Sequence, residues 1–214
     1  MRIIIFLLAA GFIFTHEVRA DEVDTQYWHE TVFRKNFNEN IGIFLKAEQW
    51  LFDDMKRLAL YNFAPGILFR PSRFLDFELN YRYQTLRETT TRNHEHRIGI
   101  VPILKYEWGK FKFSLRNRLE LRDIDGDHSL RLRERLKIKR KVELMGMDVA
   151  LFASNEIFYN SNPDDFDQNR AKFGISKPIQ PNLSMDIYYM YFRQERSNGW
   201  FTAHALGTFL SVTF

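Results

Sequence analysis

The 214-residue sequence contains no cysteine. This absence excludes disulfide bridges, cysteine-ligated zinc, thiol catalysis and a lipid-bearing cysteine. Glycine and proline are also scarce, at 10 and 6 residues. No segment approaches the 18 or more apolar residues of a membrane-spanning helix, and a mean hydropathy of -0.38 excludes a bundle of such helices. The apolar share is 45%, so the chain can bury a core and is not disordered.

The first twenty residues predict a secretory signal peptide. Arg2 supplies a basic start, Ile3 to Phe14 is apolar, and small or moderate side chains at 18–20 precede a cleavage point before Asp21. The alternative is an N-terminal anchor, but a spanning helix needs about 20 apolar residues and this run is shorter. We therefore expect an exported chain that begins near Asp21.

The mature chain carries only a small positive charge. Residues 1–20 include Arg2, Arg19 and Glu17, so cleavage changes 31 basic and 27 acidic side chains to 29 and 26, a net charge of +3. So modest an excess on an exported protein argues against nucleic-acid binding.

Most of the chain alternates between apolar and polar residues. Residues 110–122 place Phe and Leu on one parity and mainly basic side chains on the other, and 75–84, 129–141 and 183–191 do the same. The apolar positions of 129–141 would scatter around a helix, so the strand interpretation is favoured. These alternating stretches have 9 to 13 residues, which suits the 9 to 11 that cross a bilayer at a tilt.

Turn signals divide the chain evenly. They fall at Asn38–Asn40, Asp53–Lys56, Pro71–Ser72, Glu88–Asn93, Trp108–Gly109, Ile124–Asp127, Glu143–Gly146, Asn160–Asp167, Pro178–Pro181 and Ser197–Gly199. Ten breaks predict ten strands after the first break, and alternate turns sort into a longer and a tighter set, as in outer-membrane barrels with long outer loops and short periplasmic turns.

The expected fold is thus all-β, a transmembrane antiparallel up-and-down barrel of about 10 strands (10–12). If both barrel ends are periplasmic the strand count is even, so residues 25–37 are interpreted as part of a lead segment rather than an eleventh strand. The predicted organisation is a signal peptide at 1–20, a periplasmic or lumen-facing lead segment at 21–40 and the barrel at 41–214. A twelve-stranded barrel is the main alternative.

The C-terminal segment supports a barrel of the outer membrane. Phe214 is the last residue, and Leu206, Thr208, Leu210 and Val212 share its parity. This pattern resembles the final strand by which the barrel-assembly machinery recognises its substrates. The expected location is the outer membrane of a Gram-negative bacterium, in contact with its lipid and lipopolysaccharide. A soluble periplasmic barrel is a further alternative.

Energetics predict which parity faces the lumen. A basic side chain facing lipid near the midplane costs up to ~2–4 kcal/mol, so the Arg and Lys residues of 110–122 and 129–141 should point inward and form a cationic wall. The candidate lumen residues are Arg116, Arg118, Arg131, Arg133, Arg135 and Lys137 with Glu48, Glu78, Glu107, Glu156 and Asp186. Glu134 shares the outward parity of Leu132, and we expect it near a membrane interface or beside an outward basic side chain.

Two outcomes remain open for this network. The opposite charges can pair and fill the lumen, or the wall can border a path or pocket that attracts small anionic solutes.

No catalytic or metal-binding motif stands out. His94 and His96 share one strand face, but their parity is that of Ile98 and points outward, and His204 also lies on an outward parity. The sequence has no phosphate-binding glycine loop, nucleophile elbow or metalloprotease helix, so no catalytic residue, metal ligand or cofactor is assigned.

Several segments resemble a known family. They are Phe152 to Tyr159, Asp167 to Arg170, Gly174, Pro181 to Leu183, Tyr188 to Tyr191, Trp28, Tyr106 and Glu107, and Asn117 to Arg122 ahead of Arg131 to Arg133. Together they resemble the uncharacterised bacterial outer-membrane β-barrel family known as domain of unknown function 2490 (DUF2490). The resemblance covers nearly all of the mature chain and implies the barrel fold without an assigned activity. It carries over no catalytic residue.

These observations predict an outer-membrane barrel with a charged, largely ion-paired lumen and a structural or anion-leaning permeation role. The alternative is a lumen- or rim-based enzyme acting on lipid, lipopolysaccharide or peptide.

Overall fold

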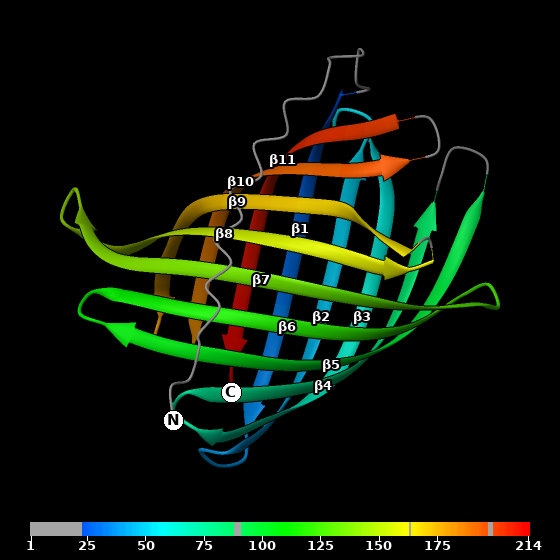
Figure 1. Cartoon of the computed structure of the whole chain (residues 1–214). Coiled ribbons are helices and arrows are strands. Elements are labelled where there is room, and N and C mark those ends of the chain that lie inside the picture. The colour runs from blue at the N-terminus through cyan, green and yellow to red at the C-terminus, as the bar shows by residue number, and fades with distance from the viewer. Residues whose placement is uncertain (1–22, 88–90, 163, 197–198) are drawn as a thin grey trace, which may run out of the picture.

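The computed structural model describes residues 23–87, 91–162, 164–196 and 199–214, and these form a closed β-barrel of eleven strands (Figure 1). The strands are β1 (Val23–Asn36), β2 (Ile41–Phe52), β3 (Arg57–Ser72), β4 (Leu75–Arg87), β5 (Arg92–Trp108), β6 (Phe111–Ile124), β7 (Asp127–Leu144), β8 (Met147–Ser161), β9 (Asp164–Gln180), β10 (Leu183–Arg196) and β11 (Gly199–Thr213). The described residues include no helix able to cross a membrane. The predicted signal peptide lies outside them.

Neighbours in sequence pair antiparallel around the barrel, and the barrel closes where β1 pairs with β11 in parallel. The blue β1 and the red β11 accordingly point the same way in Figure 1. The all-β barrel is confirmed, but residues 23–36 form a barrel strand, which corrects the predicted lead segment and raises the count from ten to eleven. The even count assumed that both chain ends lie at one end of the barrel, and a parallel seam removes that requirement.

Side chains on the outer surface of the seam hydrogen-bond to one another. The Tyr27 hydroxyl lies 2.7 Å from Thr208 Oγ1, and His29 Nδ1 lies 2.7 Å from the same oxygen. His29 Nε2 lies 2.9 Å from Thr31 Oγ1. These polar outward positions interrupt the apolar pattern that marks the outer face of the other strands.

The connections are short at both ends of the barrel. The end at which β1 begins, called the loop end below, carries the connections that follow β2, β4, β6, β8 and β10. The predicted long breaks at Asn160–Asp167 and Ile124–Asp127 shrink, because β8 continues to Ser161 and β9 starts at Asp164, while β6 and β7 leave only 125–126. The prediction that one set of turns is longer than the other is therefore wrong. Each predicted break nevertheless lies at or close to a connection between strands.

The predicted facing of the strands is confirmed. Leu132 and Leu136 are each 50% exposed on the outer surface. Arg131 and Arg133, on either side of Leu132 in the sequence, are only 9% and 8% exposed. The same contrast holds on β4, where Leu79 is exposed and Glu78 is buried. The outer surface is thus a belt of apolar side chains, and the interior is polar with an aromatic sector.

Close aromatic packing fixes one side of the interior. The Tyr188 ring occupies the space that a side chain at Gly207 would need, since its Cζ lies 2.1 Å from that Cβ position. Trp28, Phe192 and Phe201 belong to the same buried cluster. Glycine at 207 therefore leaves room for the Tyr188 ring. The aromatic side chains gather on β1, β10 and β11, opposite the strands that carry most of the arginines.

Candidate functional site

Arginines form a ladder on the inner face of β5, β6 and β7. The alternation of each strand points them inward, and the register sets them directly across from one another: Arg116 opposite Arg135, Arg118 opposite Arg133, and Arg97 opposite Arg122. Like charges in cross-strand positions repel. This wall therefore needs anionic groups close by.

One carboxylate lies at the centre of the wall. Glu120 is fully buried and forms ion pairs with four arginines. Its Oε2 lies 2.6 Å from Arg131 Nε, and its Oε1 lies 3.0 Å from Arg133 Nη1. Arg118 and Arg97 approach the same oxygen at 3.1 and 3.2 Å. Four cations around one carboxylate leave this part of the wall with a net positive charge.

Further pairs tie the wall to the other strands. Arg133 Nη2 lies 2.9 Å from Glu156, and Arg122 Nε lies 2.6 Å from Glu95. In another part of the lumen Arg82 pairs with Glu48 at 2.8 Å. The predicted network of opposite charges is therefore present over much of the barrel.

A cavity of about 980 Å³ occupies the part of the lumen that borders the loop end. All eleven strands contribute to its lining. Its cationic residues are Lys56, Arg57, Arg82, Arg87, Arg97, Arg116, Arg118, Arg122, Arg131, Arg133, Arg135, Arg170, Lys172 and Arg196, and its acidic residues are Asp24, Glu30, Glu48, Asp53, Asp54 and Glu156. Even after Glu95 and Glu120 are included, cations exceed acids by six, which makes the cavity strongly attractive to anions.

Within the described parts of the chain, six of these cations lack an ion-pair partner. Two of them, Arg87 and Arg196, are exposed near the loop end, and the other four lie inside the barrel. Among the described residues, Arg116, Arg135, Arg170 and Lys172 have no carboxylate within 4.0 Å, and Glu30 is the corresponding unpaired acid deep in the cavity. Arg116 is only 9% exposed, and its Nε and Nη2 have no hydrogen-bond partner. The Nε atoms of Arg135 and Arg170 are unpartnered as well. A buried charge without a counterion is costly, so this arrangement favours a bound anion.

Aromatic rings surround Arg170 in place of carboxylates. Its guanidinium lies 4.8 Å from the ring centre of Trp28, 5.3 Å from Trp50, 4.7 Å from Phe158 and 5.2 Å from Phe192. Trp28 and Trp50 stack on each other at 3.7 Å. Cation–π contacts stabilise the charge without cancelling it, so Arg170 keeps its attraction for an anion in the cavity.

The lumen is packed and paired toward the opposite end of the barrel. Val32, Phe44 and Leu68 form a cluster there with exposures of 0 to 6%. Lys46 Nζ lies 2.7 Å from Glu78, and Lys137 Nζ lies 3.7 Å from Asp186. These cations have partners, unlike the four beside the cavity. The cavity is therefore accessible from the loop end and narrows to packed side chains beyond it.

The turn between β2 and β3 lies at the cavity mouth. Asp53, Asp54 and Met55 all have positive φ values, and their backbone bonds to the start of β1, with Met55 N donating to Thr25 O at 3.1 Å. The hydrogen bond from Arg57 lowers the pKa of Asp53. The turn at the cavity mouth thus has a constrained backbone, and its Asp53 carboxylate favours the ionised form.

The structure brings together most of the predicted lumen residues. Arg116, Arg118, Arg131, Arg133, Arg135, Glu48 and Glu156 line the cavity, while Glu78, Lys137 and Asp186 lie in the paired part beyond it. Glu107 is different. It pairs with Lys112 near the end of β5 with its side chain 64% exposed, so it lies at the rim opposite the loop end.

Sequence reasoning missed Glu95, Arg97, Glu120 and Arg170 as members of this site. Alternation places all four inward. Alternation could not supply the register of β5, β6 and β7, which gathers four arginines around Glu120, or the packing that leaves Arg170 without a carboxylate partner.

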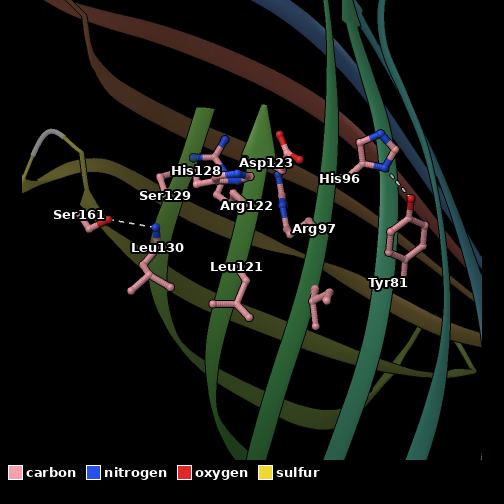
Figure 2. A pocket seen from close by; sticks show the side chains of 11 residues that line it. Tyr81, His96, Arg97, Leu121, Arg122, Asp123, His128, Ser129, Leu130 and Ser161 are labelled. Carbon is pink, nitrogen blue, oxygen red and sulfur yellow. Dashed lines mark hydrogen bonds between the residues drawn. The ribbon is translucent and has the colours of Figure 1, made fainter. Parts of the chain in front are cut away.

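A second hollow of about 500 Å³ lies on the outer surface near the loop end (Figure 2). Its lining includes His96, Asp123 and His128, which the register places in one row across β5, β6 and β7. His96 Nδ1 lies 2.6 Å from the Tyr81 hydroxyl, as Figure 2 shows, and Asp123 Oδ1 accepts the Gly126 N–H at 2.9 Å. Among the described residues, Asp123 hydrogen-bonds to neither histidine, and no group of three or more acidic or histidine side chains could hold a metal. The row therefore has no assembled catalytic contact.

The comparison with known families assigns the chain to one of them. The profile of a family of proteins of unknown function, DUF2490, matches residues 25–203, which is most of the chain. The chain belongs to the DUF2490 family. Neither a search of curated proteins nor a search of solved structures found a match. The match begins within β1 and ends at residue 203, early in β11, so it covers most of β1 and only the start of its partner at the seam.

Proposed function

We propose that this DUF2490 protein is an outer-membrane β-barrel that takes up small anions from the loop end and binds them in its lumen. The strands have 12 to 18 residues, enough to cross a bilayer at a tilt. Leu132, Ile67 and Leu79 are among the many large apolar residues whose side chains are about half exposed on the outer belt. A soluble monomer rarely exposes so continuous an apolar surface, so this belt supports insertion in lipid.

The expected surroundings follow from this location. Membrane lipid and lipopolysaccharide would contact the belt, and the barrel-assembly machinery would bind the C-terminal strand that ends in Phe214. That residue is 66% exposed, which leaves it accessible for recognition.

The observation that carries the functional proposal is the set of unpaired cations beside the cavity. Arg116 and Arg135 are cross-strand neighbours without a carboxylate partner, so their repulsion is relieved when an anion lies between or beside them. Guanidinium groups bind phosphate and carboxylate oxygens with directional, charge-assisted hydrogen bonds. The ligand class is therefore a small multivalent anion, for which inorganic phosphate and pyrophosphate are suitable probes.

Anion binding can be measured by titration calorimetry on the detergent-purified barrel with phosphate and pyrophosphate. Arg116→Gln removes an unpaired charge but keeps a polar, uncharged side chain, and we expect the affinity to fall by about tenfold or more, because a charged hydrogen bond contributes about 1.5–3 kcal/mol. Arg73→Gln is the matched control, since Arg73 lies in the turn at the other end of the barrel. Absence of binding by the unmodified protein, or equal losses in the two variants, would contradict the proposal.

The packed far end predicts binding rather than steady conduction. Val32, Phe44 and Leu68 pack together in the lumen beyond the cavity, and Lys46 there is paired with Glu78. We therefore expect planar bilayers containing the unmodified protein to stay silent at moderate voltage. Steady anion-selective conductance would instead assign the protein a permeation role.

A further inference from the structure

A group of polar residues lies on the outer surface of β6–β9, near the middle of the strands, where the neighbouring outward side chains are apolar. This polar patch consists of Asn117, Glu134, Asn155 and Asn169. Asn117 is directly opposite Glu134, and Asn169 lies on the same cross-strand row through Ile157. Asn155 is two residues from Ile157 on the same face. The four side chains are therefore neighbours.

The patch lies at mid-height of the apolar belt. Asn117, Glu134 and Asn155 are each close to the middle of their strands. Leu132 and Leu136, on either side of Glu134, are both 50% exposed. The position of Glu134 therefore differs from the expected one at an interface or beside a basic side chain.

The hydrogen bonding of the patch is incomplete. Asn155 and Asn169 bond to each other in both directions, at 3.2 and 3.1 Å, and each amide keeps a second N–H. Among the described residues, exposed Glu134 has no ion pair or hydrogen bond. The polar residues on the outer side of the β1–β11 seam differ in this respect, because His29, Tyr27 and Thr208 satisfy one another. Facing lipid, the patch would leave polar groups without partners, which is unfavourable in hydrocarbon.

We infer that this face binds the same face of a second copy of the chain, with Glu134 and the three asparagines at the contact. Two copies in one membrane share their orientation, so a two-fold axis runs along the membrane normal and each residue meets residues at its own height. Asparagine amides both donate and accept, and their free N–H groups suit the carboxylate of Glu134. The patch is therefore complementary to itself.

The neighbouring side chains allow a close approach. Ala153 and Ala171, which share the outward parity of Asn155 and Asn169, are small, and small residues with polar ones are typical of contacts between membrane segments. This inference rests on the membrane location proposed above, but it is independent of anion binding.

The test uses the absence of cysteine from the chain. Asn155→Cys introduces a single thiol into the patch, and Leu45→Cys places one on the outer face of β2, across the barrel, where Leu45 is 42% exposed. After oxidation in outer-membrane fractions, we expect a disulfide-linked dimer for Asn155→Cys and a much weaker dimer band for Leu45→Cys. A thiol at 155 links to itself only if the two copies meet through this face.

A second pair of variants tests the role of the carboxylate. Glu134→Leu should abolish the dimer, while Glu134→Gln, which keeps donors and acceptors, should retain it. Native mass spectrometry of the unmodified chain should give the mass of two copies. A monomeric mass together with the absence of the 155 cross-link overturns the inference, as does cross-linking only to a protein of different mass. Failure of the location itself would be recognised separately, because the chain would then be missing from the outer-membrane fraction.

Discussion

Glu120 shows how one buried side chain organises many others. It is fully buried and pairs with Arg97, Arg118, Arg131 and Arg133. Its inward position was predictable from the alternation of β6. Its role as the shared partner of four arginines was not predictable, because that role depends on which strands lie on either side of β6 and on their register. Glu107 illustrates the converse, since an inward position at the end of a strand left it exposed beside Lys112.

We expect Glu120→Gln to destabilise the barrel far more than Glu107→Gln. The first change leaves four buried arginines around a neutral amide, which should lower the free energy of unfolding by about 3–5 kcal/mol. The second breaks a largely exposed, solvent-screened pair and should leave the free energy of unfolding almost unchanged. Urea unfolding in lipid vesicles, followed by the gel mobility of the folded form, measures both values. Similar midpoints for the two variants would show that Glu120 is not the centre of the network.

At the scale of strands, alternation predicted facing well where one side of a strand is charged and the other apolar. β7 is the clearest case, with Leu132 outside and Arg133 inside. The lead-segment interpretation of β1 was wrong because it assumed an even strand count, and a strand at residues 25–37 makes the count odd. Facing is a local property with a period of two, whereas the parallel seam joins residues from the two ends of the chain and leaves no local signal.

Leu132→Arg and Arg133→Leu should therefore have different effects. Leu132→Arg puts a cation against lipid, at a cost of ~2–4 kcal/mol near the midplane, and we expect a marked loss of assembled protein. Arg133→Leu leaves the outer belt intact, so the chain should still insert, with a lower unfolding midpoint because Glu156 loses its partner. Heat-modifiable gel migration of outer-membrane fractions reports the assembled share. Equal assembly of both variants would contradict the facing described above.

For the whole molecule, an odd number of strands places the two ends of the barrel chain on opposite sides. β1 begins at the loop end, next to the start of β11, and β11 finishes at the other end. An even-stranded barrel would instead bring the first and last residues to the same side. Whether the number of strands is odd or even can therefore be determined by finding on which side of the membrane each end of the barrel chain lies.

In the proposed outer-membrane location, with the loop end facing the cell exterior, an epitope tag inserted just after Asp21 should be accessible on intact cells, while the C-terminus at the periplasmic end should stay protected. Antibody labelling of whole cells, compared with cells whose outer membrane has been opened, measures this difference. A tag in a turn at the other end of the barrel, such as the one at Gly109, is the matched control and should be labelled only after opening. Protection of the tag at Asp21 in intact cells would favour a ten- or twelve-stranded arrangement.

The seam between β1 and β11 also bears on the order in which the barrel can form. Val23 pairs with Thr202, and Arg34 pairs with Thr213, so almost the whole chain separates the two partners. Contacts of such long range form slowly, because a large loop must close before they contribute any stability. Until the last strand arrives, β1 is an open edge able to pair with any other strand. Every incomplete chain, whether still in transit or cut by a protease before β11, therefore carries an exposed edge at each end of its sheet, and a factor that shields β1 during this interval would raise the yield of closed barrels.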